Sequence, residues 1–261
     1  MISIKSPEEI EKMRRAGQLT ARVLTALGEI IKPGISTMEI NDFCDRYIVD
    51  TLGAIPGSKG QYGYPYAVNT SVNQVICHGM PASNQLLKKG DIVNVDITVV
   101  YEGYYGDSSK MFAIGEISSH AKRLIDVTQS CLYRGIKAVK PGATLGDIGH
   151  AIQSHAEKNN YSVVREYCGH GIGNKMHEEP QVMHYGKPGS GLKLEEGMTF
   201  TIEPMINQGK PDVKHIKKDG WSIAVTKDRL LSAQWEHTLL VTKSGHEILT
   251  LRDEERGQND L

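Results

Sequence analysis

Apolar and small residues near the start of the chain recur every three or four positions, which is the spacing of one face of an α-helix. This face is formed by Ile10, Met13, Gly17, Ala21, Leu24, Gly28 and Ile31. Ser6 and Glu9 precede the run at the spacing of a capping box, which satisfies backbone N–H groups at a helix start. Pro33 and Gly34 are typical of a helix end. The pattern predicts a helix over residues 7–31.

The periodicity then changes from that of helices to that of strands. Residues 53–63 contain four glycines and a proline, which predicts a loop. Over residues 92–100, β-branched residues mostly alternate with polar ones, as in a strand. Residues 102–103 (Glu-Gly) suit a hairpin turn, and the return strand is expected over residues 104–114.

Two stretches of the chain recur in the same order. Residues 31–40 (IKPGISTMEI) resemble residues 139–148 (VKPGATLGDI), and each copy opens a further helix, the first expected to end near residue 52. Residues 90–96 (GDIVNVD) resemble residues 197–203 (GMTFTIE), in that a glycine precedes six strand residues ending in a carboxylate. One such match arises easily by chance in a long chain, but two in the same order indicate a duplication.

The duplication predicts an α+β fold built from two related halves around a shared central antiparallel sheet. The halves span roughly residues 7–115 and 119–251, each with two helices followed by strands. Asp96 and Glu203 fall at equivalent points of the two halves. Because no Pro/Ser-rich linker separates them, we expect a single domain over residues 1–261.

Composition narrows the class of protein. The 261 residues include 30 Lys and Arg against 31 Asp and Glu, and 39% are hydrophobic, which fits an ordinary soluble globular protein. No apolar stretch approaches the ~18 residues of a membrane span, and the balanced charge argues against a dedicated nucleic-acid binder. The four cysteines are at least 33 positions apart, and the N-terminus lacks signal-peptide features. We expect a cytoplasmic protein.

Four carboxylates stand in strand-like, apolar surroundings. Asp96 lies in the middle of the predicted strand, and Asp107 lies on the return strand, where we expect the two to meet across the hairpin. Glu203 and Glu236 occupy similar runs. Any one of them alone is most simply a solvated strand edge or a buried salt bridge. Four together are costly to bury unless cations or protons lie between them.

His170 is flanked by glycines on both sides, which allow the backbone to approach a ligand closely. Beside four carboxylates it is the natural nitrogen ligand of an oxygen-rich site, which suits a pair of divalent ions such as Mn, Fe, Co or Zn. His78 and His177 lie in predicted loops, where the alternative is an ordinary surface histidine. The sequence assigns no role to the histidines at positions 120, 150, 155, 184, 215 and 246.

Several short segments carry a family resemblance. They are Cys77-His78-Gly79, Asn94-Val95-Asp96, Gly106-Asp107-Ser108, Gly169-His170-Gly171-Ile172-Gly173, His177-Glu178-Glu179-Pro180, Thr201-Ile202-Glu203-Pro204-Met205 and Gln234-Trp235-Glu236-His237-Thr238. Together they strongly resemble the type I methionine aminopeptidase family of bacterial size, over nearly the whole chain. The resemblance implies the "pita-bread" fold, whose pseudo-twofold halves agree with the repeat.

The resemblance also implies roles for individual residues. The five metal ligands of two divalent ions would be Asp96, Asp107, His170, Glu203 and Glu236, with Asp107 and Glu236 bridging. His78 and His177 would contact the substrate, and Glu203 would accept a proton from the attacking water. The methionine pocket would include Tyr64, Met205 and Trp221, with Met176 where an aromatic residue is usual. The same loop departs from the usual pattern at Ser58, Gln61 and Asn69, where Cys, Tyr and Cys are expected.

Two alternatives stay open. The first is a peptidase of the same fold acting on X-Pro bonds, although such enzymes usually carry an extra N-terminal domain and the catalytic pattern here begins almost at Met1. The second is a non-catalytic relative that serves as a binding module, although such relatives lose ligands that are all present here. A type II enzyme is excluded, because the 33 positions from Glu203 to Glu236 leave no room for its helical insertion.

The expected partners follow from the same resemblance. Substrates would be peptides and nascent chains with an N-terminal methionine, the second residue being small. A basic loop is either a solvated loop or a contact for ribosomal RNA, and consists of Lys210, Lys214, His215, Lys217 and Lys218. We expect a monomer that does not bind membranes.

Overall fold

The structure is a computed structural model that describes residues 2–256. The first half contains α1 (Pro7–Ile30), α2 (Thr37–Arg46), β1 (Ile55–Pro56), β2 (Val68–Val72), β3 (Val75–Cys77), β4 (Ile92–Tyr101) and β5 (Tyr104–Ala113). The second half contains α3 (Ser119–Lys137), α4 (Leu145–Lys158), β6 (Ser162–Val163), β7 (Gly169–Gly171), β8 (Glu178–Val182), β9 (Thr199–Ile202), β10 (Met205–Asn207), β11 (Val213–Lys218), β12 (Trp221–Thr226), β13 (Ser232–Gln234), β14 (His237–Val241) and β15 (His246–Ile248).

The predicted helix starts are confirmed by their caps. The Ser6 side chain accepts from the backbone of Glu9, and the Glu9 side chain accepts from the backbone of Ser6. The second helix has the same capping box and continues past α2 as a π-helical turn over Tyr47–Thr51. The predicted loop contains the short strand β1 and a 3₁₀ turn over Gln61–Gly63.

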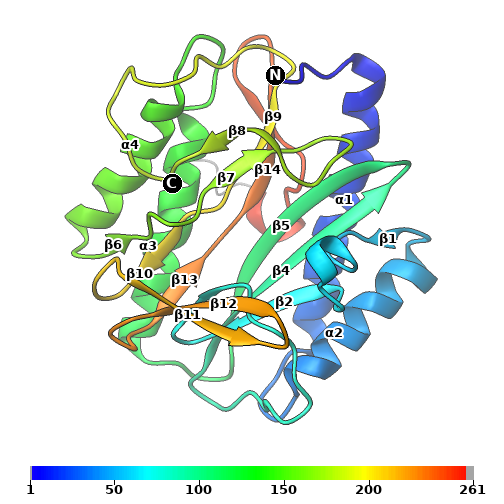
Figure 1. Cartoon of the computed structure of the whole chain (residues 1–261), viewed down its shortest axis with the longest axis vertical. Helices are drawn as coiled ribbons and strands as arrows, with labels where there is room; N and C mark the ends of the chain where they lie inside the picture. The colour runs from blue at the N-terminus through cyan, green and yellow to red at the C-terminus, as the bar shows by residue number, and fades with distance from the viewer. Residues whose placement is uncertain (1, 257–261) are drawn as a thin grey trace.

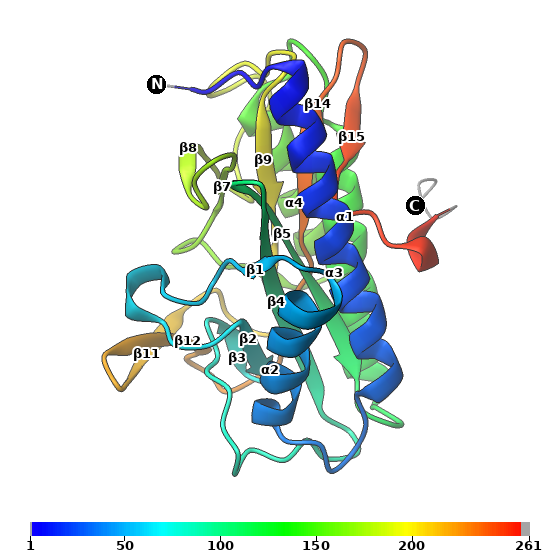
Figure 2. The same cartoon turned by 90° about the vertical axis from the view of Figure 1, so that its right-hand side faces the viewer.

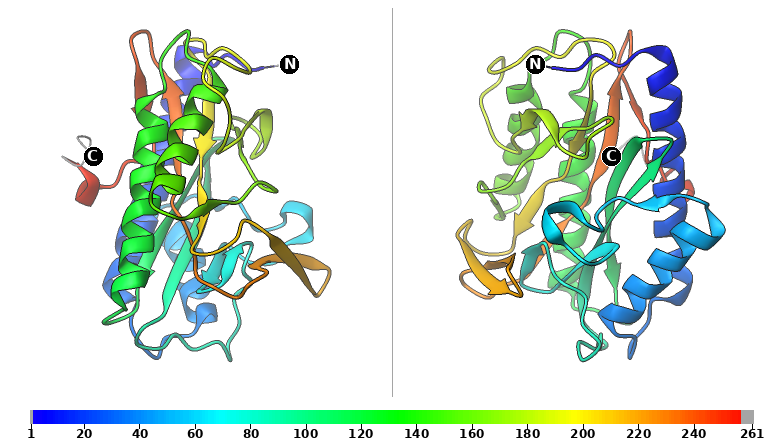
Figure 3. Two further views of the ribbon diagram at one scale, coloured as in Figure 1. Left: turned by 90° about the vertical axis from the view of Figure 1, so that its left-hand side faces the viewer. Right: turned by 45° about the vertical axis from the view of Figure 1, so that its right-hand side comes forward.

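The long strands form the middle of the molecule, and the helices pack behind them. One sheet has the order β1-β4-β2 with β5 paired to β4, and another has the order β15-β14-β9-β7-β8. Figures 1 and 2 show β4, β5, β9 and β14 running side by side, with α1 and α3 on one side of them. The hairpin β11–β12 projects from the opposite side (Figure 3). Each half has its own main cluster of buried hydrophobic side chains.

Glycines allow α1 to pack closely on β5. A Cβ atom placed on Gly106 would lie 2.6 Å from the backbone nitrogen of Gly17. The Thr20 hydroxyl donates to the carbonyl oxygen of Gly106 across the same contact, at 2.9 Å. Gly17 therefore lies on the buried helix face because it has no side chain, and not because it contributes apolar surface to the core.

The two halves repeat one another in their backbone hydrogen bonds. The N–H of Gly34 donates to the carbonyl oxygen of Leu87 at 2.7 Å, and that of Gly142 donates to Leu194 at 2.9 Å. The isolated bridge between Ser36 and Leu86 likewise has its counterpart between Thr144 and Lys193. The pseudo-symmetric α+β fold predicted from the repeat is therefore confirmed. Over the described residues, no helix is long and apolar enough to cross a membrane.

Candidate active site

A cavity of about 560 Å³ lies where the two halves meet. Every residue that the sequence analysis assigned to a site lines it, namely Tyr64, His78, Asp96, Asp107, His170, Met176, His177, Glu203, Met205, Trp221 and Glu236. Asp96 and Asp107 come from β4 and β5 of the first half, whereas His170 comes from β7 of the second. The cavity therefore exists only when both halves are in place.

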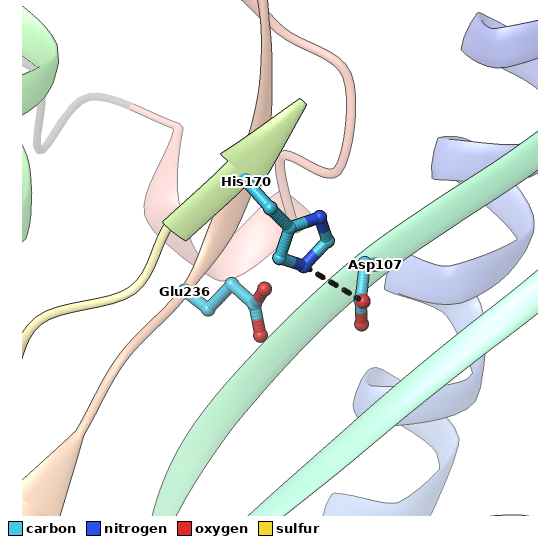
Figure 4. A group of neighbouring side chains, drawn as sticks. All are labelled: Asp107, His170 and Glu236. Carbon is cyan, nitrogen blue, oxygen red and sulfur yellow. Dashed lines mark ion pairs between the residues drawn. The ribbon is translucent and has the colours of Figure 1, made fainter. Parts of the chain in front are cut away.

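The innermost group consists of Asp107, His170 and Glu236. One ligand atom of each lies within 4.8 Å of the others, and Figure 4 shows the three side chains converging. His170 Nε2 is 3.9 Å from Asp107 Oδ2 and 3.5 Å from Glu203 Oε1. His170 Nδ1 faces the carbonyl oxygen of Gly171 at 3.0 Å, which leaves Nε2 to face the carboxylates. This is the orientation of a metal-ligating histidine whose other ring nitrogen is held by the protein.

The hairpin turn lies at residues 102–103 as predicted, but the register of the strands does not place the two aspartates opposite one another. Asp96 pairs with Ser109, and Asp107 pairs with Thr98, so the two aspartates are diagonal neighbours rather than opposite one another. The turn is centred between residues 102 and 103, one position later than the midpoint between the aspartates. The Thr98 hydroxyl donates to Asp107 Oδ1 at 3.0 Å. The carboxyl groups of Asp96 and Asp107 are still close enough for each to shift the pKa of the other.

Both glutamates lie at breaks between strands. The sequence predicted that the strand before Glu203 ends in this carboxylate, whereas it predicted one continuous strand around Glu236. Glu203 follows β9 and precedes β10, and Glu236 lies between β13 and β14. The two broken strands pair with one another on either side of the breaks, β9 with β14 and β10 with β13. The Glu236 N–H leaves this ladder and donates to the carbonyl oxygen of Ser109 on β5 at 3.2 Å. The irregularity turns both side chains into the cavity.

Asp107 and Glu236 are buried and Asp96 and Glu203 are half-buried, and no lysine or arginine is among the residues that line the cavity. Burial raises the pKa of Asp96 to about 7 and that of Glu203 to about 8. Burial, and then the neighbouring carboxylates, raise the pKa of Asp107 and Glu236 well above the usual range. Such a group favours either protons or a divalent cation between its members. Oxygen donors with one imidazole fit a divalent metal ion.

The histidines of the site are neutral at physiological pH. Burial, and then the neighbouring His177, lower the pKa of His170 to about 3. Burial lowers the pKa of His78 to about 4. The His177 ring packs edge-on against that of His170, with ring centroids 4.4 Å apart. Each ring can therefore offer one N–H and one lone pair to a ligand or substrate.

An aromatic wall adjoins the carboxylates. Tyr64 is buried, its ring lies 4.4 Å from that of Trp221, and its hydroxyl donates to the carbonyl oxygen of Val68 at 2.8 Å. Trp221 Nε1 donates to the carbonyl oxygen of His78 at 2.9 Å. Met205 is completely buried beneath. The cavity thus offers an apolar subsite next to an ionisable one.

Comparison with known proteins places this arrangement in a family. Residues 11–243 match metallopeptidase family M24. The chain is 52% identical to methionine aminopeptidase of Escherichia coli (strain K12) over 254 residues, which cover 97% of this chain and 96% of that protein. This chain belongs to the methionine aminopeptidases of metallopeptidase family M24.

Solved structures of methionine aminopeptidases agree with this assignment. The enzyme from Rickettsia prowazekii gives a TM-score of 0.93 at 50% identity, covering 96% of this chain and 100% of that one. That from Thermotoga maritima gives 0.92 at 44% identity, covering 96% and 99%. A prolidase from Pyrococcus furiosus shares the fold alone, at a TM-score of 0.75 and 24% identity over 96% of this chain and 66% of that one. The X-Pro alternative is therefore not supported.

The methionine aminopeptidase site includes residues to which the sequence analysis gave no role. His184 is fully buried, and its Nε2 accepts from the backbone N–H of Glu203 at 3.1 Å. The Tyr62 hydroxyl lies 3.3 Å from His177 Nδ1. Cys77 lines the cavity and is also part of a buried hydrophobic cluster with Met205. The contacts of His184 and Tyr62 join parts of the chain that are distant in sequence, so no local sequence pattern predicts them.

A buried network supports the two most buried carboxylates from behind. The Thr238 hydroxyl accepts from the Asp107 N–H at 3.0 Å and donates to the Asp107 carbonyl oxygen at 2.7 Å. The Ser108 hydroxyl donates to the carbonyl oxygen of Glu236 at 2.6 Å and accepts from Arg252 Nη1 at 3.0 Å. Arg252 is 1% exposed and is held by Glu255 at 2.6 Å. We call the set of four residues that forms this network the brace; it consists of Ser108, Thr238, Arg252 and Glu255.

Proposed function

We propose that this chain removes the N-terminal methionine from peptides and nascent proteins, preferring a small second residue. The observation that carries the proposal is the carboxylate and histidine group at one end of an aromatic-walled cavity. Membership of the methionine aminopeptidases supports it. The whole of residues 1–261 is proposed to act as one catalytic domain, because ligands from both halves converge on a single cavity.

The proposed metal ligands are Asp96, Asp107, His170, Glu203 and Glu236. The metallopeptidase family implies a divalent cation, and Asp107, His170 and Glu236 form a group able to hold one. We infer two ions of Co, Mn, Fe or Zn, because four carboxylates exceed what one ion needs for charge balance. When bound, such ions supply an activated water and stabilise an oxyanion.

Three side chains are proposed to act on the substrate. Glu203 would take the proton of the attacking water. Burial raises the pKa of its carboxyl group, which accepts a hydrogen bond from the Thr201 hydroxyl at 2.8 Å. His177 would donate to the carbonyl oxygen of the bond to be cleaved, and His78 would bond the departing amide nitrogen. Neutral rings suit both roles, since each must present an N–H without carrying a buried charge.

The first side chain of the substrate would lie against the aromatic wall. Tyr64, Trp221 and Met205 form that wall, and Met176 lines the same cavity. An unbranched thioether fits such a surface because it is flexible and polarizable.

The basic loop is proposed to contact ribosomal RNA. Its residues lie on and just before the exposed hairpin β11–β12, which stands away from the body of the protein in Figure 2. His215 already pairs with Glu166 at 2.9 Å, so the lysines would carry the contact. Substituting Lys214, Lys217 and Lys218 by Glu should reduce co-sedimentation with ribosomes while leaving hydrolysis of a tripeptide intact. Equal sedimentation would contradict the contact. We also infer a cytoplasmic monomer, for which a sedimentation-velocity mass near 28.8 kDa is the test.

One experiment tests the proposed function. The protein is stripped with a chelator, reloaded with each divalent metal in turn, and assayed on Met-Ala-Ser, Leu-Ala-Ser and Leu-Pro-Ser. We expect hydrolysis of Met-Ala-Ser only after metal is returned, and little of Leu-Ala-Ser. Cleavage of an X-Pro peptide in preference to Met-Ala-Ser, or no cleavage with any metal, would overturn the proposal.

A further inference from the structure

One polar side chain in the proposed methionine subsite has no partner. Asn69 lies on β2 opposite Asp96 and lines the cavity. It is 7% exposed, its Oδ1 is enclosed without a hydrogen-bond partner, and its side chain makes no hydrogen bond among residues 2–256. A buried amide left unpaired costs free energy unless a ligand satisfies it.

The neighbouring polar groups are already engaged. The Ser58 hydroxyl donates to Thr98 Oγ1 at 3.3 Å, and Gln61 Nε2 donates to the Tyr105 hydroxyl at 3.2 Å. The rest of the wall is aromatic and apolar, formed by Tyr64 and Trp221. Gln234 also lines the cavity with its Oε1 enclosed and unpaired, but its Nε2 is held by Glu203 at 3.3 Å. Asn69 is therefore a buried amide that is engaged at neither end, beside an aromatic and apolar wall.

The hydrogen-bonding groups of the Asn69 amide favour some substrate side chains of methionine size over others. A thioether sulfur is a weak acceptor and leaves the amide unsatisfied. Methionine sulfoxide has nearly the same shape but carries a strongly polar S–O group. Because neither end of the Asn69 amide is engaged, a half-turn about its terminal bond can present the NH₂ group to that oxygen.

We infer that Asn69 is a specificity-determining residue that lets this enzyme also remove N-terminal methionine sulfoxide. The inference rests on the proposed function, since the same peptide bond is cleaved by the same water. The sulfoxide is neither oxidised nor reduced in the reaction. Its sulfur is a stereocentre, and a single amide on one wall can reach the oxygen of one epimer better than that of the other.

The test compares four peptides with the metal-reloaded full chain: Met-Ala-Ser, the two sulfoxide epimers of Met(O)-Ala-Ser, and norleucyl-Ala-Ser. We expect one epimer to be cleaved with kcat/KM within about tenfold of Met-Ala-Ser. In Asn69→Leu, which keeps the volume and removes the amide, the ratio of that epimer to Met-Ala-Ser should fall by about tenfold or more. The norleucine ratio should not fall with it.

Ser58→Ala is the matched control, because its hydroxyl also lies in the cavity but is bonded to Thr98. It should leave the sulfoxide-to-methionine ratio unchanged. Hydrolysis of Met-Ala-Ser without hydrolysis of either epimer would overturn the inference, as would an unchanged ratio in Asn69→Leu. If Asn69→Leu does not fold, Asn69→Ala is measured in its place. Failure to cleave Met-Ala-Ser at all would instead contradict the proposed function.

Discussion

At the scale of single residues, the surroundings of the two central histidines differ, in line with the different roles proposed for them. His170 has one nitrogen held by a carbonyl and the other among carboxylates. His177 packs on it but is not part of the group of three ligand atoms that lie within 4.8 Å of one another. Its Nδ1 is near the Tyr62 hydroxyl, so Nε2 is the nitrogen proposed to contact the substrate.

His177→Ala should therefore lower turnover without removing the metal. A group that stabilises developing charge typically contributes 10²–10³ in kcat, so a fall of about that size is expected. Metal content after reloading should match that of the unmodified protein, measured by elemental analysis. His170→Ala, which removes a proposed ligand, is the comparison variant. Loss of metal from His177→Ala would show that His177 is a ligand.

The cavity cysteines should resist alkylation. Cys77 and Cys168 both line the cavity, and burial raises the pKa of each thiol, most strongly for Cys77. The thiolate is the reactive form, so little of it is present at neutral pH. Iodoacetamide at pH 7.5 should leave Met-Ala-Ser hydrolysis largely intact, with no label on either residue by peptide mass spectrometry. Rapid inactivation with label at Cys77 would show that the thiol is accessible and ionised.

At the scale of elements, local patterns specify the hairpin and the helices but not where strands break. The alternation of apolar and polar residues, together with β-branching, predicts the bounds of β4 to within one residue. The caps of α1 and α2 can be predicted from the sequence because they involve only residues close together in the chain. The breaks at Glu203 and Glu236 depend on pairing between segments about thirty residues apart. His184 and the brace were missed for the same reason, since the contact between His184 and Glu203 spans 19 residues and that between Ser108 and Arg252 spans 144.

The brace should tune metal affinity. Thr238→Val keeps the shape of the side chain and removes both hydrogen bonds to the Asp107 backbone. Groups that hold ligands in place typically contribute 10–100-fold to metal affinity, so weakening by about tenfold is expected. Calorimetric titration of the stripped protein measures it. Thr242→Val is the control, because its hydroxyl bonds only a turn amide near β15. If both variants weaken metal binding equally, the effect of Thr238→Val is a general loss of stability and not the loss of support for Asp107.

At the scale of the molecule, the stripped protein should become less stable as pH rises. The folded-state pKa values of Asp96 and Glu203 are about 7 and 8, above their ordinary values of 3.8 and 4.5. The folded state therefore binds more protons than the unfolded state between about pH 4 and 8, and the free energy of unfolding falls across that window.

Thermal unfolding of the stripped protein at pH 5, 6, 7 and 8 checks this dependence. The melting temperature should fall with pH, and added divalent metal should raise it more at pH 8 than at pH 5, because the metal then displaces fewer protons. The double variant Asp96→Asn, Glu203→Gln should flatten the profile. A melting temperature that rises toward pH 8 in the stripped protein would contradict the assigned carboxylates.

The matched hydrogen bonds of the two halves bear on how such a protein can arise. Asp96 and Glu203 occupy the same position of two copies of one α+β unit, and the cavity lies on the seam between the copies. A chain of half this length would form only one side of that cavity. Two such chains associated about a twofold axis would bring two equivalent carboxylates together, already able to share a cation. Fusing the genes of such a dimer would free each copy to diverge, and the first half now carries two aspartates where the second carries a histidine and two glutamates.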